Sequence, residues 1–220
     1  MMQIARGGWT WIVGPLVLGG VFCGGAWLAG WPGVAGVMCA AGMVASGFMV
    51  FFFRDPDRDG PDDPGAIVAG ADGLVRAVEE LPEHTFLKAD TVRISIFLSP
   101  FDVHVNRAPI AGEIEKLEYT PGKHLLTIRN AASEYNEHSS ILIAGPRTRC
   151  LVKQIVGPVV RRVVYWLTLS QSVGRGERIG MMKFGSRLDM YFPRDDVLVI
   201  VKKGDKVRAG ETIVATLSKD

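Results

Sequence analysis

The sequence predicts a mainly β, α+β protein in which a compact antiparallel sheet body follows an N-terminal membrane-embedded helical hairpin. Three observations lead to this prediction. Two uncharged apolar runs occupy the start of the chain, a succession of short β-rich runs follows them, and one seven-residue turn pattern occurs twice. We therefore divide the chain into a hairpin at 1–53, a linker at 54–65 and a globular domain at 66–220.

The charge distribution separates the apolar start from the rest of the chain. Arg6 is the only charged side chain before Arg54, although 22% of the 220 residues are charged and 48% are hydrophobic. The remainder is a nearly neutral body large enough for one core. It has no basic cluster that would indicate a nucleic-acid partner. Three scattered cysteines, Cys23, Cys39 and Cys150, provide neither a disulfide framework nor a metal site.

The two apolar runs extend from Trp9 to Gly30 and from Val34 to Phe53. About 20 apolar residues are enough for a helix to cross the hydrocarbon layer of a bilayer. The intervening Trp31-Pro32-Gly33 break predicts a tight turn, so both open ends lie on one side. Because Arg6 and Arg54 share that side, we expect it to be the cytoplasmic face of the cell membrane.

Other interpretations of this segment are weaker. A signal peptide has a single apolar region and a small-residue cleavage site, whereas this chain has two apolar runs joined by a turn. A buried core hairpin would need a larger body to cover it. A shallow hairpin that does not reach the far leaflet stays open, given the many glycines and Pro15.

A linker rich in Asp and Pro precedes the body, and this composition disfavours regular structure in the linker. The body after it is predicted to consist of strands. Short runs with β-branched and aromatic residues predict a mainly antiparallel sheet. The candidate strands are Leu74–Glu79, Thr91–Leu98, Glu113–Tyr119, Leu125–Arg129, Ser140–Ala144, Cys150–Val156, Val159–Leu167, Ile179–Phe184, Leu188–Phe192 and Val197–Val201.

The repeated pattern is V-x-x-G-E-x-I, which occurs at Val173–Ile179 and again at Val207–Ile213. It resembles the hammerhead turns of lipoyl and biotinyl domains, which are compact sheets built around two related turns. Ala71-Asp72-Gly73 resembles the element that opens such a fold. Two ordinary glycine turns between strands would give the same pattern, so that alternative stays open.

The step Gly185-Ser186 lies between two candidate strands, where a bend is expected. A Gly-Ser step is usually only a turn. In a strained bend, however, the Ser186 hydroxyl can attack the carbonyl of Gly185 and convert the amide into an ester. Elimination from that ester leaves dehydroalanine, which hydrolyses to a pyruvoyl group with loss of ammonia. Such a ketone forms a Schiff base with an amine and accepts the electrons released on decarboxylation.

Four motifs in order resemble the phosphatidylserine decarboxylase family, in its short bacterial and archaeal branch. They are Phe51-Phe52-Phe53-Arg54-Asp55-Pro56, Ala71-Asp72-Gly73, the run from Leu98-Ser99-Pro100-Phe101-Asp102 to Val103-His104-Val105-Asn106-Arg107-Ala108-Pro109, and Met182-Lys183-Phe184-Gly185-Ser186-Arg187. The resemblance covers nearly the whole chain. It implies a membrane enzyme that converts phosphatidylserine to phosphatidylethanolamine with a pyruvoyl group derived from Ser186.

The resemblance also implies a proenzyme that cleaves itself into chains 1–185 and 186–220, which form a heterodimer; whether it assembles further is open. Carried over by motif, Ser186 is the nucleophile, Asp72 the acid of the self-cleavage triad and His104 an acid/base group. The longer bacterial branch has a second histidine where this chain has Arg107, which leaves the base for self-cleavage undecided. Arg107 either binds the lipid headgroup or pairs with a nearby acid.

The other histidines carry less information. We expect His84 and His138, which lie in polar segments, to be surface residues, and His124 to be structural. Two rival functions remain. One is a membrane-tethered biotinyl or lipoyl-like carrier or adaptor domain with Lys183 as the modified lysine, and the other is a pyruvoyl decarboxylase of a soluble amino acid.

Overall fold

The chain forms two compact units, Met1–Asp57 and Arg58–Asp220, in the computed structural model. The structure describes residues 2–125, 127, 135–157, 163–183 and 186–218. Each unit is described by itself below.

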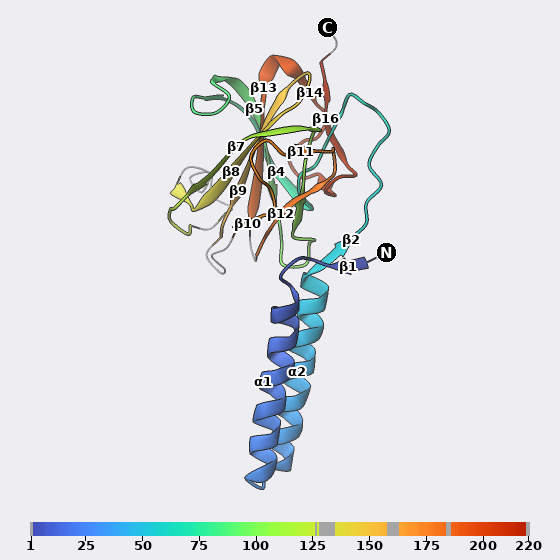
Figure 1. The fold of residues 1–220 in the computed structure, drawn as a ribbon, viewed down its shortest axis with the longest axis vertical. Coiled ribbons are helices and arrows are strands. Elements are labelled where there is room, and N and C mark those ends of the chain that lie inside the picture. Colours follow the sequence, from blue (N-terminus) through green and yellow to red (C-terminus); the bar gives the residue numbers. More distant parts are fainter. Residues whose placement is uncertain (1, 126, 128–134, 158–162, 184–185, 219–220) are drawn as a thin grey trace. The chain divides into compact units, whose positions relative to one another are not determined.

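The first unit contains the expected helical hairpin, whose helices α1 (Trp9–Leu28) and α2 (Pro32–Phe52) run side by side (Figure 1). Small residues bring the helices together. A Cβ added to Gly19 would lie 2.8 Å from the Cα of Gly42, so neither position has room for a side chain. Ser46 Oγ donates to the carbonyl of Ile12 across the same contact, at 2.7 Å. Close approach at small residues with a polar bond between helices is typical of packing in lipid.

The outer surface of this hairpin is apolar and mostly uncovered. Only 6% of the most apolar window of α1 and 17% of that of α2 are buried, which is too little for the core helices of a soluble protein. Both helices are long and apolar enough to cross a membrane, and they are consistent with membrane association. Strands β1 (Met2–Ile4) and β2 (Arg54–Pro56) pair antiparallel at the open end of the hairpin.

The second unit is built from antiparallel strands, as predicted. Eight strands form one sheet in the order β11-β7-β8-β9-β13-β5-β4-β15, and two three-stranded sheets have the orders β10-β12-β6 and β14-β16-β3 (Figure 1). The strands are β3 (Ala66–Val68), β4 (Gly73–Glu83), β5 (Ala89–Phe97), β6 (Val105–Arg107), β7 (Gly112–Thr120), β8 (His138–Ala144), β9 (Arg149–Ile155), β10 (Val163–Tyr165), β11 (Ser172–Val173), β12 (Arg178–Met182), β13 (Arg187–Pro193), β14 (Val197–Val199), β15 (Lys206–Val207) and β16 (Ile213–Leu217). A short 3₁₀ turn, η1 (Arg194–Asp196), joins β13 to β14.

Alternating side chains make the core of this unit. Alternate residues of β5, from Val92 onward, and of β13 are buried apolar residues that pack against the rest of the core, because alternate residues of a strand share a face. They are Val92, Ile94 and Ile96 in β5 and Leu188, Met190 and Phe192 in β13. Two candidate strands differ from the prediction. Leu125 and Thr127 are not in a strand, and the other residues of that candidate lie outside the described residues. Of the candidate Val159–Leu167, residues 159–162 lie outside the described residues, and within the described part only β10 forms.

The sheet orders reveal an internal two-fold repeat. Seven strands, β3-β4-β5-β13-β14-β15-β16, have the same pairings as the seven consecutive strands from β6 to β12. Both β4 and β7 carry a bulge at the same place, after Val75 and after Ile114. The two copies meet where β9 pairs with β13. The second copy is therefore inserted into the first, between β5 and β13.

The repeated turn pattern is one visible trace of this symmetry. Gly176 and Gly210 adopt the same left-handed conformation, with φ +79° and +75°, and a Cβ on Gly210 would lie 3.4 Å from the Cα of Gly176. Gly176 N donates to Ala108 O and Gly210 N to Ala69 O, at 2.8 and 2.9 Å. The two hammerhead-like turns thus lie back to back and are related by the internal two-fold repeat.

Candidate active site

Ser186 directly precedes the central strand β13. Its carbonyl accepts a hydrogen bond of 3.0 Å from Leu98 N, which fixes it at the end of β5. The residue is only 1% exposed, and its buried Oγ has no hydrogen-bond partner among the described residues. Gly185, the other half of the predicted cleavage bond, lies outside the described residues. A buried hydroxyl without a partner costs about 1–3 kcal/mol, and no hydrogen bond has to be broken before the Ser186 oxygen can react.

His104 is held by the turn that precedes β6. Asp102 Oδ2 accepts hydrogen bonds from the backbone and the hydroxyl of Ser99, both at 2.7 Å, which closes the turn. His104 Nδ1 lies 2.9 Å from the carbonyl oxygen of Asp102. Because a carbonyl can only accept, Nδ1 carries the proton, and Nε2 of the neutral ring has the lone pair that a base needs.

The backbone brings His104 toward Ser186. Met182 N, at the end of β12, donates to His104 O at 3.2 Å. Met182 is followed by only three residues before Ser186, so the ends of β12 and β13 tie these two predicted site residues to one region. The imidazole is fully buried there.

Asp72 connects two segments that are far apart in the sequence, one at Arg58 and one at Ala209. Its Oδ1 accepts a hydrogen bond from Ala209 N, and its Oδ2 forms an ion pair with Arg58, both at 2.8 Å. Burial raises the pKa of Asp72 above its ordinary value, and the Ala209 bond and Arg58 oppose this shift. The carboxylate of Asp102, on the His104 turn, raises the pKa further. Asp72 is therefore close enough to that turn to interact with it electrostatically, and its raised pKa makes it a better proton acceptor.

Arg107, at the end of β6, is buried against the hammerhead-like turns. Its Nη1 donates to Gly176 O at 2.8 Å, and a Cβ on Gly210 would lie 2.9 Å from Arg107 Cδ. The side chain therefore packs through its methylene groups and binds a backbone carbonyl. A role in headgroup binding stays a prediction.

Arg187 anchors the start of β13 on the other face of the sheet. It forms a buried bidentate ion pair with Asp189, with distances of 2.7 and 2.8 Å.

His138 is buried, at 8% exposed, so the expectation that it would be a surface residue is wrong. Its polar neighbours suggested solvent, but its Nδ1 lies 2.7 Å from Asn136 O at the start of β8, and burial lowers its pKa.

Three polar residues that the sequence reasoning missed form a chain of hydrogen bonds that ends at Asn106, two residues after His104 in the sequence. Ser139, Gln154 and Asn106 come from β8, β9 and β6, and all three are fully buried. Ser139 Oγ donates to Gln154 Oε1 and Gln154 Nε2 donates to Asn106 Oδ1, both at 2.7 Å. They are far apart in sequence, and no local pattern connects them.

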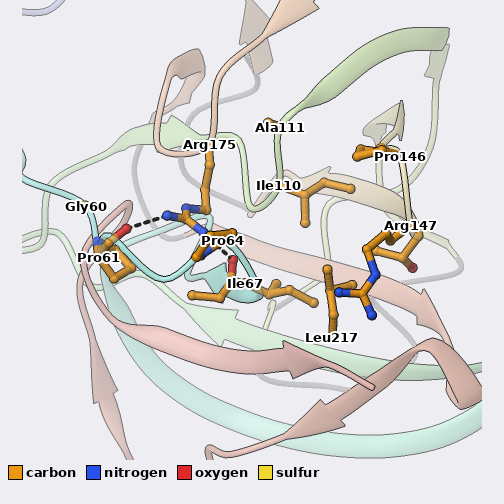
Figure 2. Close-up of a pocket in the computed structure, with 13 residues that line it drawn as sticks. Gly60, Pro61, Pro64, Ile67, Ile110, Ala111, Pro146, Arg147, Arg175 and Leu217 are labelled. Carbon is orange, nitrogen blue, oxygen red and sulfur yellow. Dashed lines mark hydrogen bonds between the residues drawn. The ribbon is translucent and has the colours of Figure 1, made fainter. Parts of the chain in front are cut away.

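A cavity of about 380 Å³ lies elsewhere, and none of the predicted site residues line it. Figure 2 shows its apolar lining, which includes Ile67, Ile110 and Leu217, with Arg147 and Arg175 at its edge. Thr148, which also lines it, is the counterpart of Ser186 in the internal repeat, since Gly145 N donates to Thr148 O as Leu98 N does to Ser186 O. We therefore do not place the chemistry in this cavity.

Comparisons with known proteins agree with the motifs. The family model for phosphatidylserine decarboxylase matches residues 45–215. Three similar proteins are each named phosphatidylserine decarboxylase proenzyme. The protein from Desulfotalea psychrophila is 42% identical over 176 residues, covering 80% of this chain and 82% of its own length. That from Carboxydothermus hydrogenoformans is 45% identical over 170 residues, covering 77% and 80%. That from Salinibacter ruber is 42% identical over 205 residues, covering 92% and 88%.

Proposed function

The chain belongs to the phosphatidylserine decarboxylase family, and we propose that it matures by cleaving itself between Gly185 and Ser186. The mature enzyme would then convert phosphatidylserine to phosphatidylethanolamine. The observation that carries the self-cleavage is the buried Ser186 Oγ without a partner, at the amino end of β13. A serine in that state loses no stabilising hydrogen bond when it attacks its own backbone.

Self-cleavage requires the proton of the Ser186 hydroxyl to leave as its oxygen attacks the Gly185 carbonyl carbon. We assign this proton to the lone pair of His104 Nε2 because the Asp102 carbonyl fixes the ring tautomer. The Ser186 nitrogen leaves the Gly185 carbonyl and becomes an amine, so the amide becomes an ester. Loss of the Cα proton of residue 186 then expels the Gly185 carboxylate, and water releases ammonia from the dehydroalanine that remains.

A pyruvoyl group at position 186 would fit a buried site of this kind, from which water is excluded. It supplies an electron sink for the electron pair left behind when carbon dioxide departs. The residues of the chain provide orientation and protons. We propose that His104 returns a proton to the substrate α-carbon after decarboxylation, and that Arg107 contributes to headgroup binding.

The apolar hairpin supports a lipid substrate. We propose that α1 and α2 lie in the cell membrane with Arg6 and Arg54 on the cytoplasmic side, and that the second unit also lies on that side because the chain leaves the hairpin there. The hairpin would then keep the second unit attached to the membrane that contains the lipid substrate. Chains 1–185 and 186–220 would remain together as a heterodimer.

Mass spectrometry of the purified full-length protein tests this function. We expect two chains that end and begin at Gly185 and residue 186, with a ketone at the new amino end. One intact chain modified at Lys183 would support a carrier domain instead. Lys183 is only 8% exposed, whereas a carrier lysine must be accessible to the enzyme that modifies it. Turnover of free amino acids, but not of phosphatidylserine in micelles, would instead support the soluble-substrate alternative.

Asp72→Asn should slow self-cleavage about 100-fold or more, because general acid–base groups contribute at least that much. The amide keeps an oxygen for the hydrogen bond from Ala209 N, so the fold is expected to survive. The fraction of split chain over time, measured on denaturing gels, gives the rate. Glu211→Gln is the matched control, since Glu211 is the other carboxylate partner of Arg58 and should be dispensable. Equal rates in Asp72→Asn and the wild type would remove Asp72 from the reaction.

A further inference from the structure

The cavity of about 380 Å³ lies where the internal two-fold repeat places the counterpart of the predicted site. Leu217 N donates to Gly65 O at 2.9 Å, as Met182 N does to His104 O at 3.2 Å. In this copy Gly65 therefore takes the place of His104, and Leu217, which lines the cavity, takes the place of Met182. The repeat thus accounts for a cavity at this position.

The side chains proposed for the reaction are replaced in this copy. Ala111 directly precedes β7 as Asp72 directly precedes β4. Thr148 takes the place of Ser186, and its Oγ1 donates to Asp196 Oδ2 at 2.8 Å. Both Ala111 and Thr148 line the cavity. A methyl group and a hydroxyl already bonded to a carboxylate offer neither acid nor nucleophile, so this copy is suited to binding without chemistry.

The lining of the cavity is suited to a hydrocarbon chain. Apart from Thr148 and two arginines, the lining residues are apolar or glycine, with Ile67, Ile110 and Leu217 among them. A water molecule occupies about 30 Å³ of liquid, so 380 Å³ is room for about a dozen groups the size of a methylene. One acyl chain fits in this space, and the two chains of a phospholipid do not.

The charged side chains that line the cavity are both cations. Arg147 Nη2 donates to Ser218 O at 2.8 Å, which holds its guanidinium at the edge of the cavity (Figure 2). Arg175 donates to backbone carbonyls of the linker and of β3, which carry no net charge. No Asp or Glu is among the described lining residues. The edge therefore favours an anionic group, and a guanidinium matches the planar geometry of a carboxylate.

We propose that this cavity binds a free fatty acid, with its chain between Ile67, Ile110 and Leu217 and its carboxylate at Arg147. The volume favours one chain, and a carboxylate adds the required charge in little space. A lysophospholipid shares one chain and an anionic group, but it also carries a glycerol phosphate, for which the cavity has less room. The correspondence with the predicted site supports a lipid ligand only through the proposed function, whereas the lining, the volume and the charge are independent of it.

Photolabelling of the full-length protein in phosphatidylcholine nanodiscs tests the site. The probe is dodecanoate with a diazirine near the end of its chain, and labelled peptides are identified by mass spectrometry. We expect saturable labelling of the peptides that contain Ile110 and Leu217, displaced by unlabelled dodecanoate. Labelling of α1 and α2, whose apolar surface is uncovered, is the internal reference. Ala111→Trp should abolish labelling of the cavity, because Ala111 is an exposed lining residue and an indole there would fill the space.

Arg147→Gln tests the position of the carboxylate. Its labelling should fall about 10-fold to 100-fold, because it loses a charge-assisted hydrogen bond. Arg149→Gln is the matched control, since Arg149 pairs with Glu115 and does not line the cavity, and it should label like the wild type. A dodecanol probe with the same diazirine should label weakly and equally in the wild type and in Arg147→Gln. Thermal unfolding of each variant separates a lost fold from a lost site.

Three results would overturn the proposal. They are cavity labelling in the wild type no stronger than in folded Ala111→Trp, equal labelling of Arg147→Gln and the wild type, and stronger labelling by a lysophospholipid probe than by dodecanoate. Denaturing gels of the same samples show whether the chain splits, which tests the proposed function separately. A chain that binds dodecanoate at this site without splitting would refute self-cleavage and leave the fatty-acid site in place.

Discussion

Ser186→Ala should give a single uncut chain with no decarboxylase activity. Without a hydroxyl, nothing at this position can attack the Gly185 carbonyl, and no ketone can form. Because Ser186 Oγ makes no hydrogen bond, its removal should leave the fold intact. Denaturing gels and intact mass show whether the chain is split, and turnover of phosphatidylserine in micelles shows activity.

Thr148→Ala is a control that the fold itself provides. Thr148 occupies the position of Ser186 in the other copy of the internal repeat, and its Oγ1 binds Asp196 at 2.8 Å. Its loss should cost about 1 kcal/mol of stability and leave splitting unchanged. Continued splitting of the Ser186→Ala chain at the same bond would show that the nucleophile is another group.

His104→Ala should lower phosphatidylserine turnover by about 100-fold to 10,000-fold, the range for a lost general acid or base. The structural reason is the bond from Nδ1 to the Asp102 carbonyl, which leaves Nε2 as the group able to take and return a proton. Turnover must be measured on molecules that have already split, since the same variant is also expected to slow self-cleavage.

The exposed residue His84 is the control for this experiment, because His84→Ala removes an imidazole that lies on the surface in the turn between β4 and β5. It should split and turn over lipid like the wild type. Normal turnover by split His104→Ala would exclude His104 from the decarboxylation step.

The sequence predicted the hairpin and the longer strands well. The uncharged runs predicted α1 and α2 to within a few residues, because a length and composition suited to crossing a membrane can be recognised in the sequence itself. Long strands such as β5 and β13 could be predicted because their buried residues form runs rich in β-branched and aromatic side chains. The three-residue strands β3 and β6 were missed. They form because distant segments pair with them, and their own residues carry no periodic signal.

The residues of the site also divide into those that a local motif reveals and those that only the fold brings together. Ser186, His104 and Asp72 were predicted by motif, and the structure ties His104 and Ser186 to one region through Met182. Asn106, Gln154 and Ser139 could not be predicted, since their contact depends on the register of strands from three parts of the chain. The internal repeat was visible only at its turns, because one copy interrupts the other in sequence and their side chains have diverged.

The pairing of β13 determines what a cut before Ser186 would leave in place. This strand pairs with β9 on one side and β5 on the other, and β15 and β16 of the same short segment pair with β4 and β3. A break in the covalent chain would therefore remove no strand from the sheets. The chain 186–220 would stay bound to the chain 1–185 through the backbone hydrogen bonds of these strand pairs and through the shared apolar core. Only denaturation should separate the two polypeptides, and a new chain end would appear inside a fold that was already complete.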